Sequence, residues 1–290
     1  MTVITRFAPS PSGKLHLGHA LSAVLAHEFA RLEGGTFLLR IDDIDAARSR
    51  PEFVNAALED LTWLGLEWQG EPIFQSRRLD LYESALARLS EADLIYPCFC
   101  TRAEITAEVA ASASAPHGDF GVPYPGTCRQ LSDEERLARS HEPHCWRLDM
   151  GRALEQVEHL GIELVWDDAF AGRVLAQPEA AGDVVLARKD APASYHLAST
   201  IDDAAMGITD VVRGQDLFAS THIHRLLQAL LHLPTPRYHH HPLIADASGK
   251  RLAKRDAAME LQALREAGTD GSALAQDLLE GRLPASYSLV

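Results

Sequence analysis

The chain has 290 residues, of which 46% are hydrophobic and 23% are charged. This composition predicts a globular protein that can bury a core and divide into two modest domains. No apolar run reaches the roughly 18 residues of a membrane-spanning helix, and the first residues do not resemble a signal peptide, so we expect a cytoplasmic protein without membrane contact. The formal net charge of −14 argues against a general nucleic-acid binder, and any RNA partner must meet a local basic patch.

The first hundred residues alternate between strand-like and helix-like patterns. Strands are expected at residues 3–7 and 36–41, and helices at residues 18–33, 51–65 and 79–89. A loop containing prolines and a glycine joins the first strand to the first helix. Strands that alternate with helices predict an α/β protein with a parallel sheet.

The pattern changes near residue 97, where an inserted module is expected to begin. Two closely spaced cysteines precede an Ala/Ser-rich stretch and a turn-rich stretch that ends at residue 126. Short strands are expected at residues 145–149, 162–166 and 183–187. Helix–strand alternation then resumes over residues 195–231, where we expect the sheet to close.

The segment HLGH at residues 16–19 enters the first expected helix directly after the loop. His16 and His19 are three residues apart, so both imidazoles project from one side of the first turn, beside unpaired backbone N–H groups and the positive end of the helix dipole. Gly18 allows a nucleotide to approach the backbone closely. The segment is suited to a phosphate chain, although a capping pair of surface or core histidines would give the same four letters.

A second basic element, GKRLAKR, occupies residues 249–255 near the other end of the chain. It is not a Walker loop, because Ile244 stands where the earlier glycine is required. In addition, Arg251 follows Lys250 where a Walker loop has Ser or Thr. Lys250 and Lys254 can reach the same anion from a glycine-hinged loop. A solvated run of charge is the alternative reading of this segment.

Together, the two elements resemble the HIGH and KMSKS signatures of class I aminoacyl-tRNA synthetases, in the expected order. The segment RFAPSPSG at residues 6–13 resembles the opening of the glutamyl and glutaminyl branch of these enzymes, and further similarity lies in RIDDID at 40–45, WLGL at 63–66 and VRGQDL at 212–217. The resemblance implies a Rossmann-type catalytic domain whose halves are residues 1–96 and 191–256. The inserted, acceptor-type module would be residues 97–190, and a short helical extension would be residues 257–290.

Within that branch, the chain resembles the subfamily that lacks an anticodon-binding domain and glutamylates the queuosine base of tRNA(Asp). Because 35 residues follow Arg255, we expect no further domain of typical size. The resemblance implies ATP and L-glutamate as substrates, Mg²⁺ as a cofactor, and the anticodon stem-loop of queuosine-containing tRNA(Asp) as the acceptor. We expect the enzyme to act as a monomer.

The inserted module carries a candidate zinc site. Cys98 and Cys100 are followed by YPGTC at residues 124–128, so the thiolates of Cys98, Cys100 and Cys128 and the phenolate of Tyr124 are the candidate ligands. Four ligands would close the coordination sphere and make the zinc structural. This assignment leans on the resemblance, with His117 and Cys145 as substitutes for Tyr124 and buried free cysteines as the alternative reading.

Glutamate presents two carboxylates and an ammonium group, so a selective pocket requires guanidinium groups and a carboxylate. The resemblance implies that Arg6 and Arg213 bind the carboxylates, with hydrogen bonds from Ser10 and Tyr195. Asp42 would receive the ammonium, although related enzymes usually carry Glu at this position. Structural ion pairing within the sheet is the alternative role for either arginine.

The resemblance also implies how ATP is bound. Pro9, Gly18, His16 and His19 would contact the nucleotide, and His16, His19 and Lys254 would stabilise the charge that develops on the phosphates. Three other functions stay open: a small-molecule ligase or nucleotidyltransferase that uses the same HxGH tetrad, such as pantothenate synthetase; a non-catalytic synthetase-like binding module; and a trimmed enzyme that charges tRNA(Glu).

Overall fold

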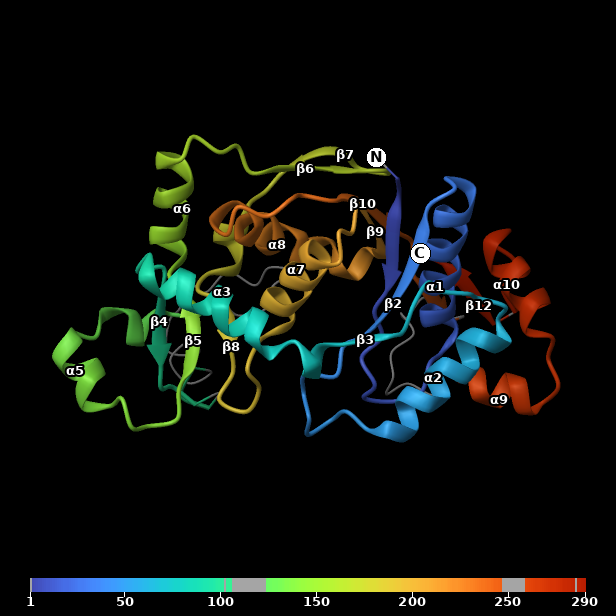
Figure 1. Ribbon diagram of the computed structural model, residues 1–290, viewed down its shortest axis with the longest axis horizontal. Helices are drawn as coiled ribbons and strands as arrows, with labels where there is room; N and C mark the ends of the chain where they lie inside the picture. The colour runs from blue at the N-terminus through green and yellow to red at the C-terminus, as the bar shows by residue number, and fades with distance from the viewer. Residues whose placement is uncertain (1, 102, 106–123, 247–258, 285) are drawn as a thin grey trace.

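A computed structural model describes residues 2–101, 103–105, 124–246, 259–284 and 286–290 (Figure 1). Its central feature is a parallel sheet in two hydrogen-bonded halves, β3-β2-β1 and β9-β10. The strands are β1 (Ile4–Phe7), β2 (Thr36–Ile41), β3 (Ile73–Phe74), β9 (Asp210–Gly214) and β10 (Arg237–His241). The two halves of this sheet meet between β1 and β9, where the backbone N–H of Thr209 donates to the carbonyl of Ile4 at 3.0 Å.

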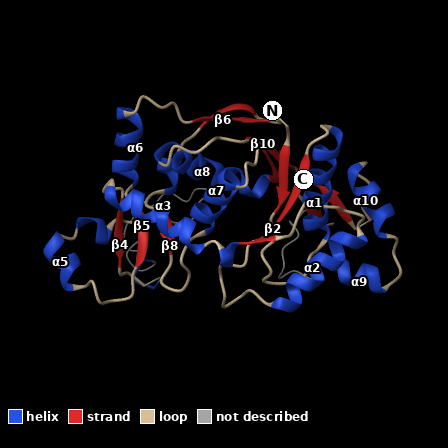
Figure 2. Ribbon diagram, in the orientation of Figure 1, coloured by secondary structure: helices blue, strands red, loops and turns tan. Residues whose placement is uncertain are grey.

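Helices cover both faces of the sheet (Figure 2). The helices of the first half are α1 (Leu17–Leu32), α2 (Pro51–Trp63) and α3 (Leu79–Glu91), and those of the second half are α7 (Tyr195–Ala205) and α8 (Phe218–Leu230). The hydrophobic core has two parts, one on each face of β9. Val211 packs with α7 and α8 in one part, whereas Val212 packs with α1 in the other. The α/β class and the parallel sheet predicted from the sequence are confirmed.

The sheet extends past residue 231, where the sequence predicted that it would close. β10 pairs in parallel with β9, from Arg237 opposite Asp210 to His241 opposite Gly214. This strand was missed because its three histidines, residues 239–241, do not form an apolar run. Each is nevertheless buried, and each has a polar partner on a neighbouring element.

A second, antiparallel sheet lies at one end of the molecule (Figure 1). Its strands are β4 (Ile95–Cys98), β5 (Cys145–Leu148) and β8 (Val185–Ala187), and the segment between them also forms α5 (Asp133–Ala138) and α6 (Met150–His159). The hairpin of β6 (Val165–Asp168) and β7 (Gly172–Leu175) leaves this module, because β6 pairs with β10 through Asp168 and Tyr238. The β6–β7 hairpin therefore extends the strands β9 and β10.

The last described residues pack on the other end of the molecule, beside α1 and α2 (Figure 1). They form α9 (Leu261–Glu266), α10 (Gly271–Leu279) and β12 (Tyr287–Leu289), which pairs with β11 (Ile244–Asp246). Short 3-10 turns complete the fold: η1 (Gln75–Arg77), η2 (Thr127–Gln130), η3 (Pro178–Ala181) and η4 (Gln215–Leu217). Among the described helices, none has the length and apolar content to cross a bilayer.

Candidate active site and cysteine cluster

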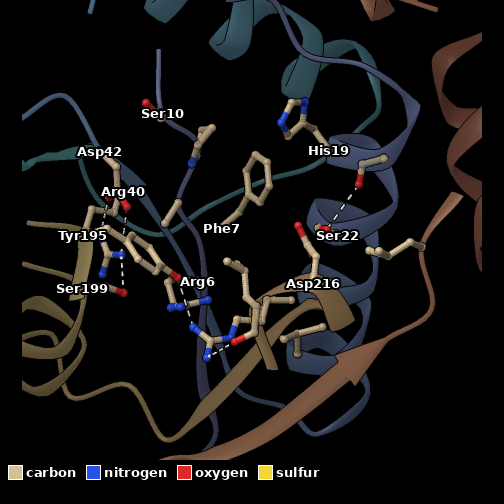
Figure 3. Close-up of a pocket in the computed structure, with 18 of the residues that line it drawn as sticks. Arg6, Phe7, Ser10, His19, Ser22, Arg40, Asp42, Tyr195, Ser199 and Asp216 are labelled. Carbon is tan, nitrogen blue, oxygen red and sulfur yellow. Dashed lines mark hydrogen bonds and ion pairs between the residues drawn. The ribbon is translucent and has the colours of Figure 1, made fainter. Parts of the chain in front are cut away.

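An open cavity of about 370 Å³ lies at the carboxyl ends of β1, β2 and β9. In doubly wound sheets, ligands bind at this edge, where successive connections leave in opposite directions. Figure 3 shows His19 and Ser22 on one side of the cavity and Arg40, Asp42, Tyr195 and Ser199 on the other. Every described residue that the sequence predicted for the glutamate and ATP sites lines this cavity: Arg6, Pro9, Ser10, His16, Gly18, His19, Asp42, Tyr195 and Arg213. Lys254 lies outside the described residues.

His16 is the N-cap of α1, and its ring orientation is fixed by the backbone. The N–H of Gly18 donates to His16 Nδ1 at 3.1 Å, and the N–H of His16 donates to His19 Nδ1 at 3.2 Å. Because each Nδ1 accepts a hydrogen bond, the proton of each neutral ring is on Nε2. Both imidazoles can therefore donate a hydrogen bond from Nε2.

Gly18 has a local role in this arrangement. A Cβ atom added at Gly18 would come within 3.1 Å of His16 Cε1 and 3.2 Å of His16 Nδ1. The missing side chain thus leaves room for the capping ring of His16. Substitution by alanine would push this ring away from the N-terminus of α1.

The described residues on both sides of segment 247–258, which contains the basic element, lie near the cavity. Ile244 lines the cavity itself. On the other side, Leu261 N–H donates to the carbonyl of Leu15 at 2.9 Å, and Lys14 Nζ lies 2.9 Å from Glu260 Oε2. Glu260 also pairs with His16 through a β-bridge. The described residues that flank this segment therefore lie near the HLGH motif.

A buried charge network forms the floor of the cavity. Arg6 donates to both carboxylate oxygens of Asp203, at 2.9 and 3.2 Å, and Arg40 Nη1 donates to Asp203 Oδ1 at 2.6 Å. Arg40 also holds Asp42, through Nε and Oδ1 at 2.6 Å. Burial raises the pKa of Asp42 despite the adjacent Arg40, whereas the pKa of Asp203 is lowered because Arg6 and Arg40 outweigh the opposing effect of its burial.

Arg213 is held on several sides of its guanidinium group. Its Nη1 donates to Tyr195 Oη at 3.1 Å, its Nη2 donates to Thr221 Oγ1 at 2.6 Å, and its Nε donates to His240 Nε2 at 3.1 Å. Arg213 is only 5% exposed, whereas Tyr195 is 39% exposed at the cavity. The buried contacts fix the guanidinium group. The hydroxyl of Tyr195, which contacts Arg213, belongs to a side chain that is exposed to the cavity.

Several residues of this site were not predicted as site residues from the sequence, notably Arg40, Ser199 and Asp203. A charged residue inside the buried strand at residues 36–41 was one available signal. A second was the pair of adjacent acids at residues 202–203, within a helix whose neighbouring positions are apolar. Buried acids and a buried arginine that are distant in sequence require each other, because an unpaired buried charge is costly.

The thiols of Cys98, Cys100 and Cys128 form a cluster in the inserted module, with their sulfur atoms within 4.8 Å of one another. Cys100 Sγ lies 3.5 Å from Cys128 Sγ and 3.4 Å from Tyr124 Oη. Two thiolates bound to one tetrahedral zinc would lie about 3.8 Å apart. The donor set and its spacing therefore fit a metal ion, and the three thiols of the predicted four-ligand zinc site lie together.

The substitutes expected for Tyr124 were Cys145 and His117. Cys145 lies outside the group of three thiols, although its thiol contacts the side chain of Cys98 and, at 3.5 Å, the carbonyl of Cys98. His117 lies outside the described residues. Tyr124 Oη also accepts the backbone N–H of Cys128 at 2.9 Å, which holds the phenol beside the sulfur atoms.

A doubly wound sheet with the HLGH motif at the start of α1 and an arginine-rich cavity at the switch point is the arrangement of a class I tRNA synthetase catalytic domain. Residues 2–280 match the family described as tRNA synthetases class I (E and Q), catalytic domain. The chain is 50% identical over 273 residues to the glutamyl-Q tRNA(Asp) synthetase of Rhodobacter capsulatus, which covers 92% of this chain and 96% of that protein. The chain belongs to this family, within the group of glutamyl-Q tRNA(Asp) synthetases.

Further similarities agree with this placement. The glutamyl-Q tRNA(Asp) synthetase of Symbiobacterium thermophilum is 46% identical over 274 residues, covering 91% of this chain and 81% of that protein. A crystal structure of the glutamate-tRNA synthetase of Elizabethkingia anophelis superimposes with a TM-score of 0.73 at 30% identity. That match covers 88% of this chain but 53% of the larger enzyme, so the chain spans about half its length.

Proposed function

We propose that this enzyme uses ATP to activate L-glutamate as glutamyl-adenylate without tRNA, and then transfers the glutamyl group to the queuosine base of tRNA(Asp). The observation that carries the first step is a single cavity lined by His16 and His19 of α1 and by Arg213 with Tyr195. The relatives named as glutamyl-Q tRNA(Asp) synthetases support the second step.

Glutamate recognition would use opposite charges on the cavity floor. Arg213, extended by Tyr195, would bind one carboxylate, while Arg6 and Ser10 would contact the other. Asp42 would receive the ammonium group through a carboxylate that Arg40 already orients. Because the shorter Asp42 replaces the usual Glu, a water molecule between carboxylate and ammonium is consistent with its reach.

In the first reaction, an oxygen of the α-carboxylate attacks the α-phosphorus of ATP, and pyrophosphate leaves. His16 and His19 would donate from Nε2 to phosphate oxygens, where negative charge accumulates in the transition state. Pro9 and Gly18 would contact the nucleotide, and Lys254 would neutralise charge toward the β- and γ-phosphates. Mg²⁺, when bound to the phosphates, supplies further charge neutralisation.

In the second reaction, a hydroxyl of the acceptor attacks the glutamyl carbonyl, and AMP leaves. The acceptor proposed is the cyclopentenediol of queuosine in the anticodon stem-loop of tRNA(Asp). Cys98, Cys100, Cys128 and Tyr124 would hold a structural zinc ion in the inserted module. The enzyme would act as a monomer in the cytoplasm.

Amino-acid-dependent exchange of labelled pyrophosphate into ATP, measured without tRNA, tests the first step. Glutamate should support exchange, and glutamine and aspartate should support it far less. Exchange that depends on a different carboxylic acid would assign the chain to the small-molecule ligases that share the HxGH tetrad. Absence of exchange with every amino acid would indicate a binding module without catalytic activity.

A further inference from the structure

A row of buried polar contacts links the β6–β7 hairpin to Arg213. Asp168, at the end of β6, lies 2.6 Å from His240 Nδ1, and His240 Nε2 accepts a hydrogen bond from Arg213 Nε at 3.1 Å. All three residues are at most 5% exposed. Of these three residues, Arg213 of β9 lines the cavity, whereas His240 of β10 and Asp168 of β6 lie behind it.

The carboxylate of Asp168 is itself fixed in position. Its Oδ1 accepts the backbone N–H groups of Phe170 and Ala171, both at 2.9 Å, in the turn of the hairpin. Its Oδ2 faces His240 Nδ1 and also accepts the backbone N–H of His240 at 3.3 Å. These contacts from Ala171, His240 and Phe170 lower the pKa of Asp168 although burial opposes the change, so the group is a carboxylate that can only accept hydrogen bonds.

This carboxylate decides which nitrogen of His240 carries the proton. A lone pair on Nδ1 would face the lone pairs of Asp168 at 2.6 Å, so the proton must be on Nδ1. Nε2 is then an acceptor for Arg213 and for the hydroxyl of Thr221, which lies 3.2 Å away. Burial, together with the charge of Arg213, lowers the pKa of His240 to about 4, so the ring is neutral near neutral pH.

We propose that Asp168 and His240 are positioning residues for glutamate recognition: Asp168 fixes the His240 tautomer, and His240 Nε2 anchors the Arg213 guanidinium group that binds the substrate carboxylate. The inference rests on the proposed function, because it assigns Arg213 to glutamate. The hairpin at residues 165–175 lies within the segment expected as an inserted module. Through Asp168, this hairpin would contribute to the specificity of the catalytic half for glutamate.

Two substitutions at one position separate anchoring from general structural support. An asparagine amide places its nitrogen near the position of His240 Nδ1, so His240→Asn keeps the contact with Asp168 and loses the acceptor for Arg213. A glutamine amide reaches the position of Nε2, so His240→Gln keeps an acceptor for Arg213 and loses the contact with Asp168. Both variants remove the imidazole ring, so they are matched controls for each other.

The Asp168→Asn variant tests the tautomer directly. The asparagine amide can donate to His240 Nδ1, which moves the ring proton to Nε2 and places it against the N–H of Arg213. A buried donor that faces another donor loses its hydrogen bond and its hydration. Both Asp168→Asn and His240→Asn should therefore raise the KM for glutamate about tenfold to a hundredfold, with little change in the KM for ATP, and His240→Gln should stay within a few-fold of the wild type.

The experiment is glutamate-dependent pyrophosphate exchange by the full chain, with the KM values for glutamate and ATP measured for each variant. KM does not depend on the fraction of folded enzyme, so a moderate loss of stability does not obscure the result. Equal KM values for glutamate in His240→Asn and His240→Gln would overturn the proposal. If Asp168→Asn does not fold, the two His240 variants decide the question. Wild-type enzyme that shows no glutamate-dependent exchange would instead overturn the proposed function.

Discussion

The imidazole rings of His16 and His19 lie with their centroids 3.8 Å apart, at the N-terminus of α1. Each Nδ1 accepts a backbone N–H from the first turn of the helix. One nitrogen of each ring therefore contacts the first turn of the helix, and the proposed function assigns the other nitrogen as a donor to phosphate. This division between the two nitrogens can be tested at His19.

His19→Asn should separate capping from catalysis. The asparagine side chain can accept the His16 N–H near the position of Nδ1, but it has no group at the position of Nε2. We expect kcat for pyrophosphate exchange to fall about a hundredfold or more, since a donor to the transition state is lost, while the melting temperature changes little. His19→Gln, which restores a donor near Nε2, should recover part of the activity. Equal activity in the two variants would contradict the assigned role.

Arg213→Lys should reduce the discrimination between glutamate and glutamine. A lysine ammonium cannot contact Tyr195, Thr221 and His240 together, because it lacks the planar fork of the guanidinium group. The ratio of kcat/KM for glutamate to that for glutamine should fall about tenfold or more. An unchanged ratio in pyrophosphate exchange would remove Arg213 from the glutamate pocket.

Zinc binding should depend on the clustered thiols and not on Cys145. Metal analysis of the purified protein should find about one zinc ion per chain in Cys145→Ser, as in the wild type, and almost none in Cys128→Ser. Loss of the metal should also lower the melting temperature, because a structural zinc stabilises the fold that binds it. Equal zinc content in the two serine variants would refute the cluster as the metal site. Tyr124→Phe tests whether the phenol is the fourth ligand.

Asp60 should make the stability of the protein depend on pH. Burial raises the pKa of this carboxyl to about 6, and its main partner is Arg265 Nε, at 3.3 Å. The folded state then holds a proton that the unfolded state has released, so this group destabilises the fold progressively as pH rises from about 4 through 6. As pH rises from 4 to 7, the free energy of unfolding of Asp60→Asn should increase by about 2 kcal/mol relative to that of the wild type. Urea unfolding measures this difference.

The control for this prediction is Glu59→Gln. Glu59 contacts the same Arg265 at 2.9 Å, but its side chain is 62% exposed. Because an exposed ion pair contributes little to stability, the substitution of Glu59 should change the free energy of unfolding by less than about 1 kcal/mol. If the free energies of unfolding of Asp60→Asn and the wild type differ by the same amount across this pH range, the pKa of Asp60 is not raised by folding.

Much of the catalytic half follows from local sequence patterns. Apolar strands at residues 3–7 and 36–41 and a glycine-containing helix start at residue 18 were sufficient to predict the first βαβ unit, and Pro51 marked the N-terminus of α2 as expected. The cavity residues were predicted through resemblance, because adjacency of Arg6 and Arg213 depends on strand order, which no local pattern specifies.

The parts that were missed depend on long-range polar pairing. β10 is a buried strand although it contains His239, His240 and His241, because Asp210, Asp168 and Ser22 supply partners from other elements. The strand expected at residues 162–166 begins instead at Val165 and includes Asp168. An acidic residue predicts a surface position from the sequence alone, because acids are rarely buried without a partner and the partner is not visible in a local pattern.

The most direct test of the proposed function is transfer of labelled glutamate to RNA. Purified enzyme with ATP should label tRNA(Asp) that contains queuosine, and it should label neither tRNA(Asp) that lacks queuosine nor tRNA(Glu). Periodate treatment of the queuosine diol before the reaction should abolish labelling. Charging of tRNA(Glu), with no label on queuosine-containing tRNA(Asp), would contradict the account and identify a trimmed glutamate-tRNA synthetase.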